Sequence, residues 1–413
     1  MERLPLFERK IVKKVAEQRL EAVAQALKIQ IEKEPEPGFM TGLAGQAIFL
    51  YSYSRSCASS RFENLGFLAL ERALGMVNNG FSWPSFAAGL AGIRFTLRYL
   101  ASRGYISESD GSALDEIDPF LQDFAAERFK QGDYDLLHGA LGMYVPDNPQ
   151  QSQQSQQSQP PQPSQPPQPP TGNRQPITAP LRRLAISPLN GHLAWPSRHP
   201  QTGTPEINLG LAHGIPSILL ALSRSAGDSD PATMLSQGVE YLLSCRLKES
   251  ANGSLFPHRM VDGKPDQPGR LAWCYGDPGI GAALWQIGVN CNRPDWQADA
   301  IGILHKAASR RETEANRVVD ACICHGTAGL ALLFYKMAIV TGHDEFLDAA
   351  AHWTRATLDH GQNPTSAAGY LFLTTGDRYI SSYSLLEGIT GVGLSLLALL
   401  DSDTLGWEQG LLL

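Results

Sequence analysis

The apolar residues of this chain fall into seven runs, and the same short motif stands at the start of each run. The motif is Gly-x-x-Gly, with Ser in place of the second glycine in one copy, and successive copies lie mostly about fifty residues apart. The copies begin at Gly42, Gly89, Gly139, Gly214, Gly276, Gly326 and Gly388. A repeat of this length has room for two helices and their connections. The pattern therefore predicts an array of helix pairs.

The two halves of each repeat differ in patterning. The run "GTAGLALLFYKMAIV" from Gly326 is apolar nearly all round, which predicts a helix buried on every side. The segment "LDAAAHWTRATLDHG", residues 347–361, has a single apolar face, which suits an outer layer. We therefore predict an all-α fold, an α/α toroid of seven inner and seven outer helices. The alternative is an open helical solenoid, which rarely buries its inner helices so completely.

One gap between motifs, from the third copy to the fourth, is longer than its neighbours. It contains "PQQSQQSQQSQPPQPSQPPQPP", which has no hydrophobic residue to bury and many prolines. Such a composition predicts a solvated, disordered linker without chemistry of its own. We expect a single domain over residues 1–413, interrupted by this linker at residues 149–170.

Composition and charge narrow the class of protein. Hydrophobic residues make up 43% and charged residues 18%, which is typical of a globular chain with a substantial core. The formal net charge of −7 argues against nucleic acid as a partner. The N-terminus lacks the apolar core of a signal peptide, and the apolar runs are too short to cross a bilayer. We expect a cytoplasmic protein, in which six unevenly spaced cysteines do not form a disulfide framework.

Two of those cysteines stand at the same place in the repeat. Cys274, in "WCYGDPG", and Cys324, in "CICHGTAG", each come two residues before the first glycine of a motif, and His325 follows Cys324. Zinc takes Cys and His ligands, and its catalytic sites keep one position open. In the turn before a helix adjacent side chains can converge on one ion, and the helix N-terminus favours thiolates. The alternatives are buried thiols without function, and Cys322 in the place of Cys324.

At these residues the sequence resembles the lanthionine synthetase C-like family, which comprises the lantibiotic cyclases and their relatives. The resemblance runs in one colinear order from Gly42 to the closing "GWEQGLLL" and implies an α/α toroid. The motifs that carry it are "INLGLAHGIPS" (residues 207–217), "GRLAWCYGDPG" (269–279), "CHGTAG" (324–329) and "SLLEGITGVG" (384–393).

The resemblance also implies a site and a reaction. The reaction is a Michael-type addition of a precursor-peptide cysteine to dehydroalanine or dehydrobutyrine, which closes a (methyl)lanthionine thioether ring. One zinc ion, with its fourth position open to water or the substrate thiolate, lowers the pKa of the attacking thiol. The implied zinc ligands are Cys274, Cys324 and His325, and the implied active-site residues are His213, Asp135, Arg270 and Tyr275.

The roles of these active-site residues follow from their chemistry. His213 is the expected general acid that protonates the α-carbon. Asp135 orients His213 or receives the thiol proton, or else only caps a helix. Arg270 stabilises the enolate oxygen or braces Asp135, and Tyr275 contributes packing or chemistry. Glu387 is expected to have a structural role in the ring.

Three departures from the family pattern concern the fourth repeat and its surroundings. Ser217 replaces the second glycine of the fourth motif, and His138 stands where a polar or acidic residue is usual. Residues 143–206 occupy the place where some bacterial cyclases carry a small inserted domain, so the docking of the peptide stays open. His138, His192 and His258 are expected to be surface or core residues.

The expected partners are a dehydrated precursor peptide, a separate dehydratase and a membrane transporter complex, the last of which would hold the protein at the membrane periphery. Other functions stay open: addition of glutathione or another thiol to dehydrated protein residues, a prenyltransferase-like toroid, and a non-catalytic peptide-binding scaffold. The adjacent Cys-His pair argues against the prenyltransferase. A scaffold has no need of an open zinc site.

Overall fold

The computed structural model describes residues 10–146, 176–198, 202–224, 229–374 and 376–413. The linker predicted at residues 149–170 lies outside these ranges. The prediction of a single domain over the whole chain therefore stays a prediction.

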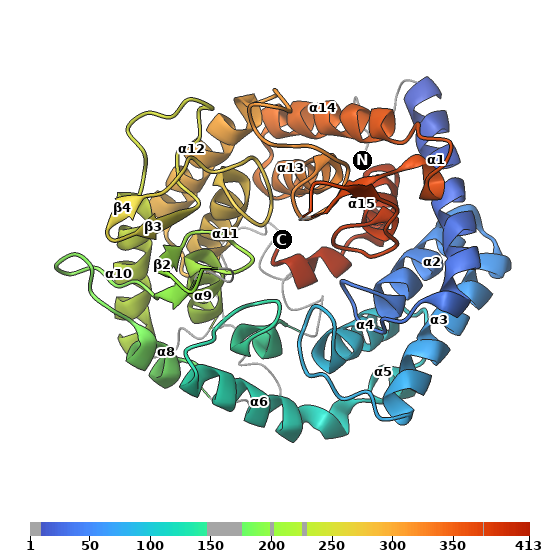
Figure 1. Cartoon of the computed structure of the whole chain (residues 1–413), viewed down its shortest axis with the longest axis horizontal. Helices are drawn as coiled ribbons and strands as arrows, with labels where there is room; N and C mark the ends of the chain where they lie inside the picture. The colour runs from blue at the N-terminus through green and yellow to red at the C-terminus, as the bar shows by residue number, and fades with distance from the viewer. Residues whose placement is uncertain (1–9, 147–175, 199–201, 225–228, 375) are drawn as a thin grey trace, which may run out of the picture.

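Helices arranged in two concentric layers form a closed ring (Figure 1). The inner layer consists of α2 (Leu43–Cys57), α4 (Leu90–Ser102), η3 (Ala140–Tyr144), α9 (Ile215–Ser223), α11 (Asp277–Asn290), α13 (Thr327–Thr341) and α15 (Ile389–Leu400). The outer layer consists of α1 (Lys10–Gln30), α3 (Ser60–Asn78), α6 (Asp118–Lys130), α8 (Thr178–Leu184), α10 (Ser229–Ser244), α12 (Pro294–Ser309) and α14 (Asp344–His360). Inner and outer elements alternate along the described part of the chain. The predicted α/α toroid is confirmed.

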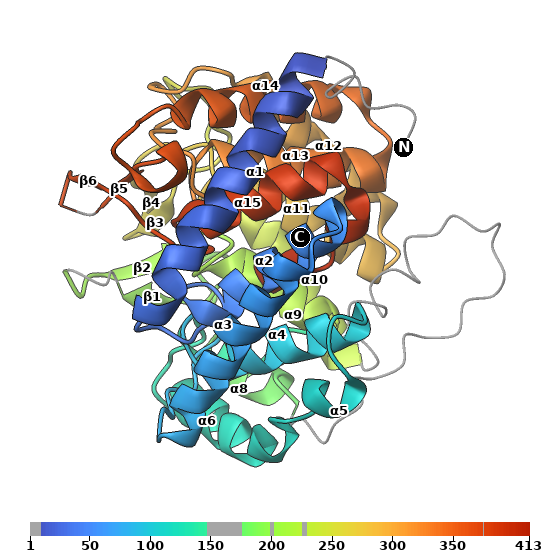
Figure 2. The same ribbon diagram turned by 90° about the vertical axis from the view of Figure 1, so that its right-hand side faces the viewer.

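The first and last repeats pack together and close the ring. Helix α1 contacts α15, and the inner helices α15 and α2 contact each other. Figure 2 shows α1 lying along the outside of α15. An open solenoid would leave these two ends apart, so that alternative is wrong.

The third inner element is much shorter than the repeat predicts. Residues Ala140–Tyr144 form a five-residue 3-10 helix instead of an α-helix. Val145 is extended and precedes Pro146, which lacks an N–H group and disfavours helical geometry in the residue before it. All seven predicted inner helices are therefore present, but this third one is reduced to a short 3-10 helix. The outer helix α8 is also short, at seven residues.

Short connecting elements complete the chain. They are η1 (Ile31–Lys33), α5 (Glu108–Gly111), η2 (Asp115–Ile117), η4 (Ala367–Gly369), η5 (Ser402–Thr404) and η6 (Trp407–Leu411). The small strands β1 (Ser197–Arg198), β2 (Pro205–Asn208), β3 (Arg259–Val261) and β4 (Lys264–Pro265) form one antiparallel sheet in that order, and β5 (Phe372–Leu373) pairs with β6 (Tyr379–Ile380). Ile207 pairs with Met260, so β2 and β3 hold the segment that leads into α9.

The burial of each layer follows its sequence pattern. Every residue of α13 from Thr327 to Tyr335 is buried. The outer helix α14 buries only one face, with its buried residues at helical spacing. Those residues are Phe346, Ala349, Ala350, Trp353, Thr354, Thr357 and Leu358. Among the described residues no helix combines the length and the apolar character that crossing a membrane requires.

The Gly-x-x-Gly motif forms the start of each inner helix: in α11 and α13 the first glycine directly precedes the helix, and the second lies in its first turn. A Cβ atom on Gly279 would strike the carbonyl oxygen of Trp273, and one on Gly329 would strike that of Ile323, in each case six residues earlier. Glycine is needed at these two positions because the chain folds back onto its own backbone there. In the fourth copy Ser217 takes this place, and its hydroxyl donates to the carbonyl oxygen of Gly214 at 2.9 Å.

Backbone hydrogen bonds link these turns around the barrel, and we call this set the backbone ring. The residue two before the first glycine of a motif donates its N–H to the carbonyl of its counterpart in the next repeat, over 2.8–3.4 Å. The bonds are Met40 to Ala87, Ala87 to Leu137, Ala212 to Cys274, Cys274 to Cys324, Cys324 to Leu386 and Leu386 to Met40.

The backbone ring has one gap, between the third and fourth repeats. The N–H of Leu137 does not reach Ala212 and donates instead to Oδ1 of Asp135 at 2.8 Å. On the other side of the gap, the bond from Ala212 to Cys274 is the longest of the ring, at 3.4 Å. The Asp135 carboxylate therefore accepts the one N–H group, that of Leu137, that the open ring leaves without a backbone acceptor.

Candidate metal centre

The repeated turn brings chemically active side chains to one end of the barrel. The position directly before the first glycine holds His138, His213, Tyr275, His325 and Glu387 in the last five repeats. In the first two repeats it holds Thr41 and Ala88. Because the backbone ring keeps the turns in register, this position recurs around the mouth of the barrel.

Cys274, Cys324 and His325 come together at two adjacent turns. Their ligand atoms, two sulfurs and one imidazole nitrogen, all lie within 4.8 Å of one another. The N–H of Cys274 donates to the carbonyl of Cys324 at 3.2 Å, which fixes the two turns side by side. Cys324 and His325 are neighbours in sequence, yet both reach the same point, because they lie in the turn ahead of α13 and not within the helix.

The protonation of this cluster is set by its own members. A hydrogen bond with Cys324 holds the pKa of the Cys274 thiol well below its usual range; burial opposes this shift, and His325 and Arg270 support it. The same contact with Cys274, together with burial, raises the pKa of Cys324. Burial disfavours the charged form of His325, but Cys274 raises its pKa overall.

The donor set fits a zinc ion. Two sulfurs and one imidazole are ligands that Zn²⁺ prefers, and three protein ligands are typical of a zinc site that leaves a position for an exogenous group. The sulfurs are buried, with Cys274 4% and Cys324 8% exposed, so a charge there needs a compensating partner. No carboxylate, third cysteine or further histidine joins this trio in the described ranges.

Cys322 belongs to a different group. It lies with Asp320 and His325, and its sulfur accepts the N–H of His325 at 3.4 Å. Asp320 already accepts backbone N–H groups from Cys322 at 2.9 Å and Leu373 at 3.0 Å. Burial, and then the charge of Asp320, raises the pKa of Cys322 well above its usual value, which favours the thiol. The structure thus places Cys324, and not Cys322, with Cys274.

His213 and Asp135 form a close pair across the gap in the backbone ring. Nδ1 of His213 lies 2.5 Å from Oδ2 of Asp135, while Oδ1 accepts the N–H groups of Leu137 and His138 at 2.8 Å each. Burial alone raises the pKa of Asp135, but the hydrogen bond and charge of His213 lower it overall. Burial likewise lowers the pKa of His213, whereas Asp135 and Cys274 raise it overall. Asp135 therefore makes both of its expected contacts, the turn cap and the partner of His213.

Arg270 is held by groups other than Asp135. Its Nη2 donates to the carbonyl of Arg317 at 2.6 Å, and its backbone N–H donates to Nε2 of His258 at 3.0 Å. Burial and the charges of Arg317 and Arg270 lower the pKa of His258 to about 4, so His258 is a neutral acceptor near neutral pH. The sequence assigned no role to His258, since it lies in no motif. Among the described residues no hydrogen bond or ion pair joins Arg270 to Asp135, so the expected bracing of Asp135 by Arg270 has no supporting contact.

Tyr275 lies between two imidazoles. Its ring centroid is 6.0 Å from that of His213 and 5.3 Å from that of His258. Its hydroxyl accepts a hydrogen bond from Nδ2 of Asn208 at 3.0 Å. Burial raises the pKa of Tyr275 to about 12, so the hydroxyl keeps its proton near neutral pH.

Glu387 occupies the position of His325 in the last repeat. Burial and then Cys274 raise the pKa of its carboxyl, while the charges of His325 and Arg270 oppose that rise. Within the described residues no side-chain hydrogen bond or ion pair engages this carboxylate, so the ring role expected for Glu387 has no supporting contact.

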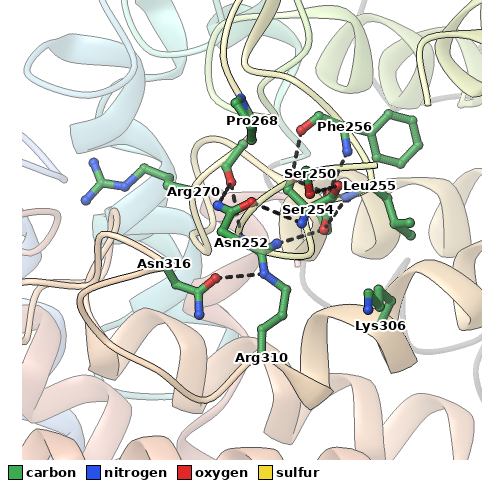
Figure 3. Close-up of polar contacts among 12 residues, drawn as sticks. Ser250, Asn252, Ser254, Leu255, Phe256, Pro268, Arg270, Lys306, Arg310 and Asn316 are labelled. Atoms are coloured by element: carbon green, nitrogen blue, oxygen red, sulfur yellow. Dashed lines mark hydrogen bonds and ion pairs between the residues drawn. The ribbon is translucent and has the colours of Figure 1, made fainter. Parts of the chain in front are cut away.

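A buried polar network positions the segment that carries Arg270 and Cys274 (Figure 3). Asp277 is fully buried and accepts from Nη1 of Arg310 at 2.8 Å and from the N–H groups of Leu255 and Phe256. Nη2 of Arg310 donates to the carbonyl of Gly269 at 3.2 Å. Figure 3 shows the Arg270 side chain extending away from Arg310, which leaves its guanidinium outside this network.

Replacing Arg310 by Met is expected to destabilise the fold by about 3–5 kcal/mol, because the Asp277 charge would be left buried without its partner. Urea denaturation measures this as a loss of unfolding free energy. Arg246→Met is the matched control: its partner Asp299 is partly exposed, so removal should cost about 1 kcal/mol or less. Equal losses in the two variants would contradict the importance of the buried pair.

Comparison with known proteins agrees with this description. The sequence model of a family described as "Lanthionine synthetase C-like protein" matches residues 175–412, which include the Cys274, Cys324 and His325 cluster. The whole structure is similar to that of a nisin cyclase, with a TM-score of 0.72 and 18% sequence identity over 96% of this chain and 97% of that chain. At this identity the similarity shows the shared toroid. Because the family match spans more than half of the sequence, the chain belongs to the lanthionine synthetase C-like family.

Proposed function

We propose that this protein is a zinc-dependent peptide cyclase. Its reaction is the addition of a precursor-peptide Cys thiol to dehydroalanine or dehydrobutyrine, which gives a (methyl)lanthionine ring. The observation that carries the proposal is the cluster of Cys274, Cys324 and His325 in the same barrel mouth as the His213–Asp135 pair. Family membership and the likeness to a nisin cyclase support it.

Cys274, Cys324 and His325 would hold the zinc ion. When bound, zinc supplies Lewis acidity that converts a thiol, with a pKa of about 8.5, into a thiolate at neutral pH. The protein keeps the two cysteine sulfurs adjacent and largely shielded from water. A buried group of donors already held in place loses little freedom on binding the ion.

His213 is the proposed general acid. As the new carbon–sulfur bond forms at the β-carbon, the π electrons of the double bond move toward the α-carbon and its carbonyl oxygen. A proton from His213 then completes the α-carbon. The proton that the thiol loses passes to solvent, and a proton from solvent restores His213, so the net reaction is addition without loss of any atom.

Asp135 is proposed to keep His213 oriented and protonated. Its contact with Nδ1 leaves Nε2 as the nitrogen available to the substrate. Its lowered pKa makes it a poor acceptor for the thiol proton, so the role of base, which the sequence left open, is not favoured.

Arg270 and Tyr275 are proposed to stabilise the enolate oxygen. One Nη of Arg270 is taken by the Arg317 carbonyl, so its other N–H groups can donate to developing negative charge. The Tyr275 hydroxyl accepts from Asn208, which leaves its own proton for donation.

A synthetic peptide with one dehydrobutyrine and one downstream Cys tests the proposal. With zinc-loaded protein the Cys is expected to become resistant to alkylation, because its thiol is converted into a thioether. This conversion should be faster than in buffer alone. Glutathione is included in a parallel reaction. A glutathione adduct whose Cys is still alkylated would instead support thiol addition, and an unchanged peptide would support a binding scaffold.

The pH dependence of this reaction is expected to change in Asp135→Asn. Asp135 raises the pKa of His213 and so extends the protonated, acidic form of the imidazole to higher pH. With the neutral amide in its place, the alkaline decline of kcat should begin at lower pH. The asparagine oxygen can still accept the backbone N–H groups of Leu137 and His138, so the turn is kept. A profile identical to that of the wild type would contradict the proposed role of Asp135.

The proposed reaction also defines the partners. Its substrate contains dehydrated Ser or Thr, so a separate dehydratase must act before it on the same precursor peptide. The membrane transporter complex and the cytoplasmic location remain predictions.

A further inference from the structure

Three metal-ligating side chains also gather on the outer layer, far from the mouth of the barrel. His305 lies in the C-terminal half of α12, His343 directly precedes α14, and Glu345 lies in the first turn of α14. Helix α13 separates them from the candidate metal centre, since His325 precedes its start and His343 follows its end. At 15 residues this helix is about 22 Å long. The two groups are therefore separate sites.

The two imidazoles are held next to each other over a buried ring. Their centroids lie 5.0 Å apart at an interplanar angle of 79°. Phe346 is fully buried beneath them, with its ring centroid 4.9 Å from that of His305 and 5.5 Å from that of His343. This packing limits the orientations of both imidazoles.

The donor atoms of this group are close together and uncommitted. One nitrogen from each histidine and one carboxylate oxygen of Glu345 lie within 4.8 Å of one another. Across the described ranges the side chains of these three residues make no hydrogen bond or ion pair, and only the backbone N–H of His343 contacts a side chain, the Thr341 hydroxyl at 3.4 Å. By contrast, His213, His258 and His352 each use a ring nitrogen in a polar contact.

We propose that His305, His343 and Glu345 form a second metal site, which binds a divalent transition ion of the Zn²⁺ class and links α12 to α14. Two imidazoles and one carboxylate match the nitrogen and oxygen ligands of such ions, and water can complete the coordination. Ligand bonds of about 2.0–2.2 Å require the donors to move closer together. The partly exposed histidines and the exposed Glu345 have room to do so.

Zinc titration of the full-length, metal-free protein by calorimetry tests the site. The wild type is expected to bind two ions, and His343→Ala is expected to bind the outer ion at least about tenfold more weakly. His352→Ala is the matched control, because it removes another outer-layer imidazole that already contacts the Arg311 carbonyl. The control is expected to keep both ions. Thermal melting of each variant without metal checks that the fold is intact.

Cys324→Ala separates this inference from the proposed function. It should lose the barrel-mouth ion and keep the outer one. Substitution with Co²⁺ adds a second readout, since only the cysteine site gives thiolate-to-cobalt charge-transfer absorption. Two ions in His343→Ala, or a single wild-type ion that disappears in Cys324→Ala, would overturn the outer site. A single ion that disappears only in His343→Ala would support it and count against the proposed zinc centre.

Discussion

Zinc and thioether formation are both expected to be lost when Cys324 is replaced by Ala. Two ligands would remain, Cys274 and His325, and a buried pair of donors does not provide the three protein ligands of an open zinc site. Even the loss of a residue that only hydrogen-bonds to a metal ligand typically lowers metal affinity 10- to 100-fold, so removal of a ligand itself should lower it about a hundredfold or more. Elemental analysis gives the zinc content, and alkylation of the dehydrobutyrine peptide gives the rate.

Cys322→Ala provides the matched control for this variant. Cys322 is also buried and only two residues away, but it lies with Asp320 and outside the trio. It is expected to keep zinc and most of the activity. The reverse result, with zinc lost from Cys322→Ala and retained by Cys324→Ala, would exchange the two assignments.

His213→Gln is expected to lower kcat by a factor of about 10²–10⁴, which is the usual contribution of a general acid. Its zinc content should not change, because His213 is not among the three proposed ligands. Steady-state kinetics with the dehydrobutyrine peptide, combined with elemental analysis of the same sample, measures both quantities.

His138→Gln is the control, since His138 occupies the same position one repeat earlier. Its side chain is exposed, and its backbone N–H contacts Asp135 regardless of the side chain. We expect kcat to change by less than about threefold. A decrease in kcat as large as that of His213→Gln would assign the acid role differently.

Much of the fold could be predicted because it is encoded in short sequence features, the Gly-x-x-Gly motif and the apolar run after it, that recur along the chain. Each motif glycine folds the chain back on itself, and each following run is buried on all sides, as α13 demonstrates. The shortness of the third inner helix could not be predicted from its motif, because a motif marks where an element begins and does not fix its length. Pro146 limits that length, and its effect is visible only when the residues after the motif are considered.

The candidate site was only partly predictable for a related reason. Cys274 and Cys324 share a place in the repeat, so their proximity could be expected from the closed ring. His258, Asn208 and Arg310 have no such regularity. They reach the site through β2, β3 and α12, and these tertiary contacts leave no spacing signal in the sequence.

The backbone ring was not predictable at all, and its gap gives Asp135 two tasks. Oδ1 accepts the N–H group of Leu137, which has no carbonyl acceptor in the next repeat, and Oδ2 contacts His213. Loss of activity in Asp135→Ala would therefore combine a structural and a chemical effect. Asp135→Asn keeps the turn cap and removes the charge that acts on His213.

The repeated turn makes the barrel mouth a set of equivalent side-chain positions. Neighbouring turns hold the backbone at each position, so the side chain there can be replaced without changing a helix. Thr41 and Ala88 occupy two of these positions with side chains that neither ionise nor ligate zinc strongly. An acid, a base or a group that selects the substrate could be introduced at either position while the existing candidate site is kept.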